Sequence, residues 1–506
     1  MKNLTPEILR FIRYTSFKMD CLRQQEENPL VIDMEKARRH YNELEVIKAE
    51  KTEALAKVMP FVPTCTYKNK PKVLYKKDGS LSAHGEAWYT LLKEQHLPST
   101  TDGPVTVISG HNAGNPNSPS QVKEWLYSMG WKPCTYKYDR NKITGEEKKI
   151  EQVRYSSPSD PRKGQLTDSV LKLKAKEKGV EELEGLTVAT HRMSIFKALL
   201  ENADPEGRVV ASAGGFTNTL RLKHRSPIVN LPKVGSPWGE EIRGCIIAPK
   251  GVKEYVPTNL DVGYSSEGER FVEVDYTVCG ADVVSLEDNT KRHFLWDYDP
   301  DYVTSMMTEG YDPHLDLAKH AEEVTQEQID LYNEGKAPEL KATRTKYKVT
   351  NYSAVYGVGA AKLAREAGMS QGEAKALLEA YWERNWGVKK LAQDQYVKTL
   401  KDGSMYLKNP VSGFYYSLRN DRDTFSTLNQ GTGVFIFDTW VLRCRNKGVV
   451  FSLQYHDEHL SYVKIGNEDK QKQLLEEAMK EVNDMLKLNV EITSDIQFGG
   501  DYASVH

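Results

Sequence analysis

Hydrophobic and polar positions repeat with a helical period over the first part of this chain. Residues 5–57 are rich in charge and follow that period, which is interrupted at Asn28-Pro29. Ser118 or Ser120 is typical of a helix start, and Gly130 of the corresponding helix end. Residues 5–57 and a segment that starts at Ser118 or Ser120 are therefore predicted to be helical.

Downstream of residue 208 the pattern changes to short apolar runs, with long helical patterns between the last two of them. The strand-like runs are 208–213, 244–248, 270–274 and 449–455. The helical patterns cover 314–335, 340–368 and 371–401. Strands that flank a large helical insertion predict an α+β domain that carries a helical subdomain.

Composition narrows the class of protein only slightly. The chain has 506 residues, enough for several domains, and its 69 Lys+Arg nearly balance its 71 Asp+Glu. The net charge therefore gives no support for a nucleic-acid partner, and only the placement of the charges can. The six cysteines form no CxxC pair, which argues against a disulfide framework or a structural zinc site. With no signal peptide and no long apolar run, we expect a cytoplasmic protein without a membrane span.

Residues 58–114 differ in character from the helical stretch before them. Lysines are interleaved with tyrosines and turn residues there, at Lys68, Lys70, Lys72, Lys76, Lys77, Tyr67 and Tyr75. Two interpretations remain open: a solvated loop, or an insertion that contacts nucleic acid or a partner protein.

Two aspartates each follow an apolar, strand-like run. Asp275 ends the run at 271–274, and Asp457 ends the run at 451–456. Carboxylates held on neighbouring strands can bind two Mg²⁺ ions about 4 Å apart, and Mg²⁺ prefers such hard oxygen ligands. Each aspartate taken alone is more often an ordinary turn residue.

Four residues recur at every fourth position of the predicted helix at 340–368. They are Arg344, Lys348, Tyr352 and Tyr356. Four residues turn an α-helix through about 400°, so these side chains share one broad face about 18 Å long. Cations at one end and aromatic rings at the other suit a nucleoside triphosphate. A solvated basic edge beside buried tyrosines is the alternative, and for an isolated helix the more frequent one.

Asp275, the face from Arg344 to Tyr356, and His456-Asp457-Glu458 together resemble the three polymerase motifs of the family A DNA polymerases. Other segments are similar to that family or to its phage branch. They are Thr219-x-Arg221 with 227–232, Ser236-Pro237-Trp238-Gly239-Glu240 with Arg243, Asp312-Pro313-His314, Arg422 with Gln430-Gly431-Thr432, and Asn115-Pro116-x-Ser118 with Gly130-Trp131. The similarity covers residues 20–506.

The resemblance implies a right-hand fold with an antiparallel-sheet palm, helical fingers and a helical thumb. The domains it implies are an N-terminal helical segment at 1–30, a thumb at 31–205 with an insertion at 60–113, a palm at 206–305 and 419–506, and fingers at 306–418. The activity it implies is template-directed addition of dNTPs to the primer of a primer–template DNA, in phage replication within the host cytoplasm.

The same resemblance implies residue roles. Asp275, Asp457 and the backbone carbonyl of Tyr276 would bind two Mg²⁺ ions, with Glu458 beside them and Lys348 also in the catalytic set. The nucleotide would meet His314, Arg344, Lys348, Tyr352 and Tyr356. Primer and template would meet Arg221, Arg243, Arg422, Gln430 and His456.

The sequence departs from the family at two positions of the motif that contains Asp275: Gly280 replaces the usual Glu, and Asp282 replaces the Arg that follows. The family usually has a Glu five residues after the metal-binding Asp, where it blocks a ribose 2′-hydroxyl; counted from Asp275, that position is Gly280. Glycine there resembles the single-subunit RNA polymerases, so the alternative function is an enzyme that accepts ribonucleotides. Glu458 and Asn351-Tyr352 are of the DNA type and oppose that alternative.

No carboxylate set for a 3′–5′ exonuclease is evident in the sequence. Asp33-x-Glu35 has the spacing of one exonuclease motif, but its place at a helix start predicts a capping role. We therefore expect proofreading to be absent or to come from a separate exonuclease polypeptide. Residues 60–113 lie where some phage polymerases bind a processivity factor, which makes such a factor a second candidate partner.

Overall fold

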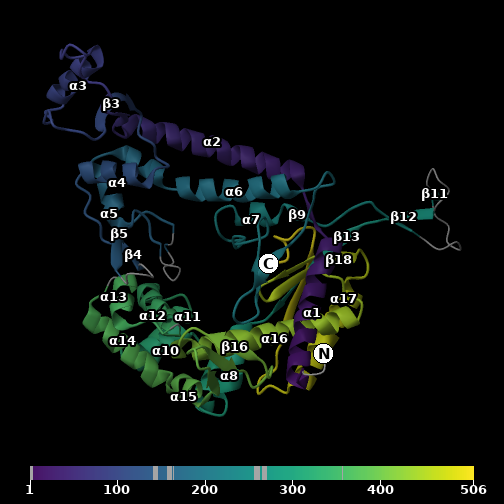
Figure 1. Cartoon of the computed structure of the whole chain (residues 1–506). Helices are drawn as coiled ribbons and strands as arrows, with labels where there is room; N and C mark the ends of the chain where they lie inside the picture. Colours follow the sequence, from purple (N-terminus) through teal and green to yellow (C-terminus); the bar gives the residue numbers. More distant parts are fainter. Residues whose placement is uncertain are drawn as a thin grey trace. The chain divides into compact units, whose positions relative to one another are not determined.

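The computed structural model describes residues 4–140, 146–156, 162, 164–255, 263–264, 270–355, 357–367 and 369–506. The chain forms two compact units (Figure 1). The first comprises Met1–Glu45, Tyr155–Gly164 and Val188–His506, and the second comprises Val46–Arg154 and Gln165–Thr187. Within the described ranges, every helix is too short or too polar to cross a lipid bilayer.

A four-stranded antiparallel sheet forms the centre of the first unit. Its strands, in spatial order, are β17 (Leu453–Tyr455), β18 (Glu458–Lys464), β13 (Tyr276–Val283) and β19 (Ser494–Gly499). Helices α16 (Thr424–Asn446) and α17 (Glu468–Leu486) pack against the sheet. Cys279, Trp440 and Leu475 are fully buried between them, and Trp440 Nε1 donates to the Leu475 carbonyl over 3.0 Å.

The N-terminal helix α1 (Pro6–Glu27) packs against α16 through a buried polar contact. Thr5 caps the helix and Pro6 occupies its first turn, where no amide donor is needed. The Lys18 ammonium lies 2.5 Å from the Asp438 carboxylate, and the Tyr14 hydroxyl donates to the same carboxylate. These contacts join residues more than 400 positions apart in the chain.

Smaller sheets surround the central one. They comprise β6 (Arg208–Val209), β1 (Leu30–Ile32) and β9 (Ile246–Ile247); β10 (Val252–Tyr255), β12 (Arg270–Val274) and β11 (Gly263–Tyr264); β14 (Val397–Thr399), β15 (Met405–Lys408) and β16 (Tyr415–Leu418); and the pair β7 (Ala213–Phe216) with β8 (Leu222–His224). Each of the four predicted apolar runs contains a strand. Three of those strands are shorter than the run that predicted them.

The predicted helical insertion lies between β13 and β14. It consists of α8 (Leu286–Leu295), α9 (Pro300–Met306), α10 (Pro313–His320), α11 (Gln326–Asn333), α12 (Leu340–Val355), α13 (Ala360–Ala367), α14 (Gln371–Arg384) and α15 (Trp386–Asp394). Each predicted long pattern is divided. A capping box at Thr325 starts α11, and Gly357, with φ +67°, separates α12 from α13. The last pattern ends at Asp394, before β14.

Helix α2 (Met34–Val58) begins in the first unit and ends in the second, and α6 (Leu186–Asn202) begins in the second and ends in the first. The predicted cap of α2 is confirmed, since Asp33 Oδ1 accepts the Lys36 amide over 2.9 Å. The first unit also contains α7 (Gly239–Arg243) and the 3₁₀ turn η3 (Asp421–Asp423).

The second unit contains two small cores. Its elements are β2 (Val62–Lys68), α3 (Ala83–Glu94), β3 (Val105–Asn112), α4 (Pro119–Ser128), β4 (Tyr136–Arg140), β5 (Glu147–Glu151), α5 (Asp168–Leu171), η1 (Lys172–Ala175) and η2 (Lys178–Leu183). Trp125 and Trp131 lie in one core, and Trp88 lies in the other, with Leu92 of α3 and Val105 of β3. Helix α4 begins after Ser118 and is followed by Gly130, as predicted.

We predict that Lys18→Met lowers the free energy of unfolding by about 3–5 kcal/mol, because it leaves the Asp438 charge buried without its partner. Lys18 and Asp438 are only 4% and 3% exposed. Urea unfolding measures the change. The matched control is Arg23→Ala on the same helix, whose exposed pair with Glu27 contributes less than about 1 kcal/mol. Equal effects of the two substitutions would contradict the prediction.

Candidate active site

Two aspartates lie together where β13 ends and β17 turns into β18. The register places Asp282 opposite Glu458. One residue further, the Val283 amide donates to the Asp457 carbonyl over 3.1 Å. Arg221, from the turn between β7 and β8, brings Nη2 to 3.9 Å from Asp457 Oδ1. Asp282 and Asp457 therefore share one end of the sheet.

Three carboxyl groups, those of Asp282, Asp457 and Glu458, influence one another at this end of the sheet. The pKa of the Asp282 carboxyl group is raised to about 7, first by burial and then by the charges of Asp457 and Glu458. Carboxylates this close oppose each other's ionisation, and a bound divalent cation relieves that opposition. Hard carboxylate oxygens are also the ligands that Mg²⁺ prefers. The donor set therefore fits a divalent cation.

The predicted pairing of Asp275 with Asp457 is wrong. The register places Tyr276, the next residue, opposite Lys464, at the end of β18 that is remote from Asp457. Asp275 precedes Asp282 by seven positions, which is roughly 23 Å along a strand that rises about 3.3 Å per residue. Two metal ions of one catalytic centre lie only about 4 Å apart. Asp275 and Asp457 are too far apart to hold the same pair.

Asp275 and Tyr276 have structural contacts of their own at the base of the β10–β12 hairpin. The Gly251 amide donates to Asp275 Oδ1 over 2.8 Å. The Tyr276 hydroxyl donates to Glu254, which also pairs with Lys464. The predicted metal contact of the Tyr276 carbonyl is therefore wrong as well.

Gly280 does not border a nucleotide pocket, so its predicted role is also wrong. It is buried in the middle of β13, between Leu460 on β18 and Gln497 on β19. A Cβ atom at this position would lie 2.7 Å from Val505 Cγ2. Glycine is needed here because the C-terminal segment packs directly on the strand. Counted from Asp282, the fifth residue is Glu287.

The first turn of α8 connects the sheet end with the helical insertion. Protein packed around the Glu287 carboxyl group raises its pKa, the nearby Arg221 lowers it, and the charge of Asp457 raises it. The neighbouring Asp288 acts on His314 of α10. Glu287 and Asp288 therefore lie within electrostatic reach of the carboxylates and of α10, respectively.

Helix α12 presents the predicted cationic and aromatic face. Arg344 Nε donates to Asp312 over 2.5 Å, and Lys348 Nζ lies 6.0 Å from the centre of the Tyr352 ring. Lys348 forms no ion pair with any residue that the structure describes. Tyr352 is exposed, and its ring lies 5.9 Å from the ring of His314. The fourth predicted member, Tyr356, lies outside the described residues.

His314 is buried beside this face, and its ring nitrogens have distinct surroundings. Burial is the main cause that lowers its pKa to about 4; Asp312 acts in the opposite direction, and Arg344 and Lys348 lower the pKa further. Asn351 Nδ2 lies 3.1 Å from His314 Nδ1 and also donates to the Pro313 carbonyl. The imidazole is therefore neutral and held in place.

The residues predicted to hold the primer lie beside the carboxylates. His456 adopts φ +65° in the turn that precedes Asp457, is exposed, and packs against the rings of Tyr455 and His224. Arg221 contacts the same Asp457. His459, three residues on, is buried against Trp440, so the two histidines do not share a site.

Arg243 and Glu458 both contact the C-terminal segment, next to the turn that carries His456 and Asp457. Arg243 Nε donates to the Pro232 carbonyl over 2.8 Å, and its guanidinium lies 4.5 Å from the Tyr502 ring. The Tyr502 hydroxyl donates to Glu458 Oε1, and His506 Nε2 lies 3.2 Å from Glu458 Oε2. Glu458 is thereby held by the C-terminal segment, which the sequence interpretation did not foresee.

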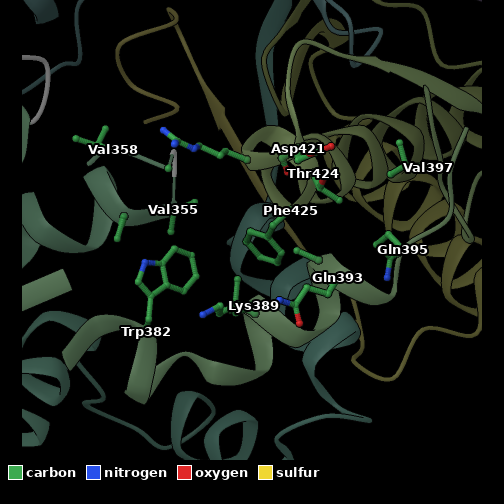
Figure 2. A pocket seen from close by; sticks show the side chains of 15 residues that line it. Val355, Val358, Trp382, Lys389, Gln393, Gln395, Val397, Asp421, Thr424 and Phe425 are labelled. Atoms are coloured by element: carbon green, nitrogen blue, oxygen red, sulfur yellow. Dashed lines mark hydrogen bonds between the residues drawn. The ribbon is translucent and has the colours of Figure 1, made fainter. Parts of the chain in front are cut away.

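A pocket of about 610 Å³ lies between the end of α12, α15 and the start of α16. Figure 2 shows Trp382, Lys389, Gln393 and Phe425 around it. Arg422 also lines the pocket and packs over Gly357, where a Cβ would lie 2.9 Å from that of Arg422. Gln430, two turns along α16, is partly exposed. Aromatic walls with cations and amides suit a nucleobase and its phosphate.

Residues 298–504 match the profile of DNA polymerase family A. This part of the chain is therefore similar to the DNA polymerase family A. The DNA-directed DNA polymerase of Escherichia phage T7 is 23% identical over 355 residues, which are 67% of this chain and 43% of that protein. DNA polymerase I of Helicobacter pylori is 27% identical over 256 residues, 48% of this chain and 24% of that protein. The chain thus spans less than half the length of either relative.

A solved structure has a fold similar to that of this chain. The polymerase domain of Pol1 from M. smegmatis, solved with a DNA primer-template and dNTP, matches with a TM-score of 0.62 at 19% identity. The match covers 96% of this chain and 70% of that one. The predicted α+β right-hand fold, with an antiparallel-sheet palm and helical fingers and thumb, is therefore confirmed.

Asp282 and Glu287 are candidate site residues that the sequence pattern did not identify. Two apolar runs, 271–274 and 276–281, follow one another, and the pattern predicts that the first is the strand that carries the site. Asp282 and Glu287 have the five-residue Asp–Glu spacing of the family A first motif. That spacing could have identified the second run.

We predict that Asp282→Asn stabilises the protein at pH 8 in the presence of EDTA. The folded pKa of about 7 exceeds the unfolded value, so the native carboxyl group retains a proton that the unfolded chain releases. Its contribution to stability is therefore lost as pH rises from about 4 to about 7. The unfolding temperature of the variant should exceed that of the wild type at pH 8, and the difference should shrink at pH 4. A difference independent of pH would contradict this.

Proposed function

We propose that this chain is a template-directed DNA polymerase that adds deoxynucleotides to a primer 3′ end, in phage DNA replication. The observation that carries the proposal is the arrangement around the first turn of α8. Asp282 and Asp457 lie on one side, and the cationic face of α12 with His314 lies toward the other. Nucleotidyl transfer requires these two groups, since one binds cations and the other binds a triphosphate. The family A match supports the same conclusion.

Asp282 and Asp457 would hold two Mg²⁺ ions, with Glu458 beside them. When bound, the ions would supply activation of the primer 3′-hydroxyl and stabilisation of charge on the pyrophosphate. Glu458 is held by Tyr502 and His506, which keeps its carboxylate close to the two aspartates without free rotation. These contacts preorganise the negative end of the site.

The triphosphate would bind to Arg344, Lys348 and His314. Lys348, which forms no ion pair with the described residues, is available to neutralise phosphate charge. The exposed Tyr352 ring would meet the sugar and base of the incoming nucleotide. Tyr356 keeps its predicted role beside the nascent base pair.

Primer and template would bind on either side of this nucleotide. Arg221 and His456, both beside Asp457, would hold the primer strand, and Arg243 would support them from behind. Arg422 and Gln430 would lie along the minor groove, where acceptor positions look alike for every correct pair. The pocket beside Arg422 has the chemistry for an unpaired template base.

The domain boundaries remain part of the proposal. We assign the palm to 206–305 and 419–506, the fingers to 306–418 and the thumb to 31–205, with an insertion at 60–113. A separate exonuclease polypeptide and a processivity factor at the insertion are the candidate partners. The insertion offers exposed Phe61, Tyr67 and Tyr75 for such a contact.

We predict that Asp282→Asn and Asp457→Asn each reduce primer extension by about 10³-fold, because each removes charge from the cation site. Primer–template affinity should remain within about twofold, since phosphate contacts dominate it. The measurement is single-turnover extension with Mg²⁺ and dNTPs. Asp275→Asn is the matched control at the other end of β13 and should extend normally. Loss of activity in Asp275→Asn alone would assign the cation site to Asp275 and refute the assignment to Asp282.

We also predict that Glu287 limits the use of ribonucleotides. Glu287→Ala should reduce the preference for dNTP over rNTP by about tenfold or more, because the carboxylate no longer blocks a 2′-hydroxyl. The ratio of extension efficiencies on one DNA template measures this. The RNA-polymerase alternative depended on Gly280 and is not favoured now that Gly280 is buried. If the wild-type enzyme used rNTPs as efficiently as dNTPs, that result would instead support the ribonucleotide-accepting alternative.

A further inference from the structure

The carboxylate of Asp312 forms hydrogen bonds to two helices, α10 and α12. Its Oδ1 accepts the amides of His314 and Leu315 over 2.8 and 3.0 Å, which caps the N-terminus of α10. Its Oδ2 accepts Arg344 Nε of α12 over 2.5 Å. Its side chain is only 14% exposed. The contact therefore ties α10 to α12 at the proposed triphosphate site.

This carboxylate is ionised in the folded protein. Burial would raise the pKa of Asp312, but the Arg344 hydrogen bond and the two backbone amides outweigh burial, and the pKa lies below its usual value. A negative charge beside a triphosphate site repels the ligand. Charge alone would favour a neutral residue here, so the benefit of Asp312 must be geometric.

The geometry determines which donors remain for the ligand. A guanidinium has five N–H donors in one plane, and the bond from Nε to Asp312 leaves the Nη donors free to turn toward a phosphate. Asn351 Nδ2 occupies His314 Nδ1, so the other ring nitrogen carries the proton and can donate. Both donors are thereby anchored through residues that do not themselves meet the ligand.

We propose that Asp312 is a positioning residue that sets Arg344 and His314 at the separation needed to bind one triphosphate. The proposal rests on the proposed function. Asp312 acts through Arg344 and through the cap of α10, and touches no substrate itself. Losing its charge releases Arg344, whereas losing its cap displaces His314.

The chain provides a matched control on the same helix. Asp316 lies one turn after Asp312, is 16% exposed, and accepts Arg384 Nε of α14 over 2.8 Å. Asp312 also caps α10, whereas Asp316 accepts the Tyr311 hydroxyl over 3.1 Å, and its cationic partner belongs to no nucleotide contact. Asp316→Asn therefore removes the charge of a similarly buried carboxylate without affecting Arg344.

The test is single-turnover extension by the full chain over a range of dNTP concentrations. Asp312→Asn keeps a capping side chain but loses the charge. It should raise the apparent dissociation constant of the dNTP about tenfold, the equivalent of about 1.4 kcal/mol. The maximal rate should change less, and primer–template affinity should stay within about twofold. Asp312→Ser, also a good cap, is the second variant in case the first folds poorly. Asp316→Asn should leave the dNTP constant within about twofold.

A double-mutant cycle separates positioning from general loosening of the fold. In an Arg344→Ala background, Asp312→Asn should change the dNTP constant less than about twofold. A full tenfold effect in that background, or the same increase in Asp316→Asn, would overturn the proposal. Active wild type with no effect of either Asp312 variant would also overturn it. Failure of the wild type to extend any primer would instead refute the proposed function.

Discussion

The pairing of β13 with β18 is the constraint on which the candidate site depends. It places Asp282 opposite Glu458 and next to Asp457, although the two aspartates are 175 positions apart in the chain. Burial raises the pKa of Asp282, and the nearby charges of Asp457 and Glu458 raise it further. The fold tolerates this arrangement because the strands are held elsewhere, by the apolar core beneath them. A bound cation would favour the charged form of Asp282 and so offset these effects.

The surrounding structure supports this register from several directions. Gly280 allows Val505 to pack against the middle of β13, so the C-terminal segment can reach Glu458. Helix α16 lies against the sheet and is fixed in turn by the buried contact between Lys18 and Asp438. The two ends of the chain therefore both stabilise the same sheet. A slip of the register by one residue would turn every side chain of β13 to the other face.

The nucleotide side of the site depends on a different kind of contact. Arg344 and His314 come from separate helices, and their separation is set by side chains that bridge those helices. Asp312 and Asn351 therefore fix the relative positions of Arg344 and His314, as the strand register fixes the relative positions of the carboxylates. Helix α8 joins the two sides, since Glu287 and Asp288 in its first turn interact with one side each. The site combines a rigid acidic platform with a cationic face that is assembled from helices.

The sequence by itself determined the α+β class, the long helical insertion, the face on α12 and the choice of Asp457 as a candidate site residue. These features depend on local periodicity and on short motifs, which a linear pattern records. It did not determine which of two consecutive apolar runs forms the central strand. It therefore paired Asp457 with Asp275, which lies at the remote end of that strand, and placed the buried Gly280 at a nucleotide pocket. It also gave no indication of the contacts from Asp312 to Arg344 or from Tyr502 to Glu458. Only the tertiary structure decided these, because strand register and contacts between distant elements depend on packing that periodicity does not encode.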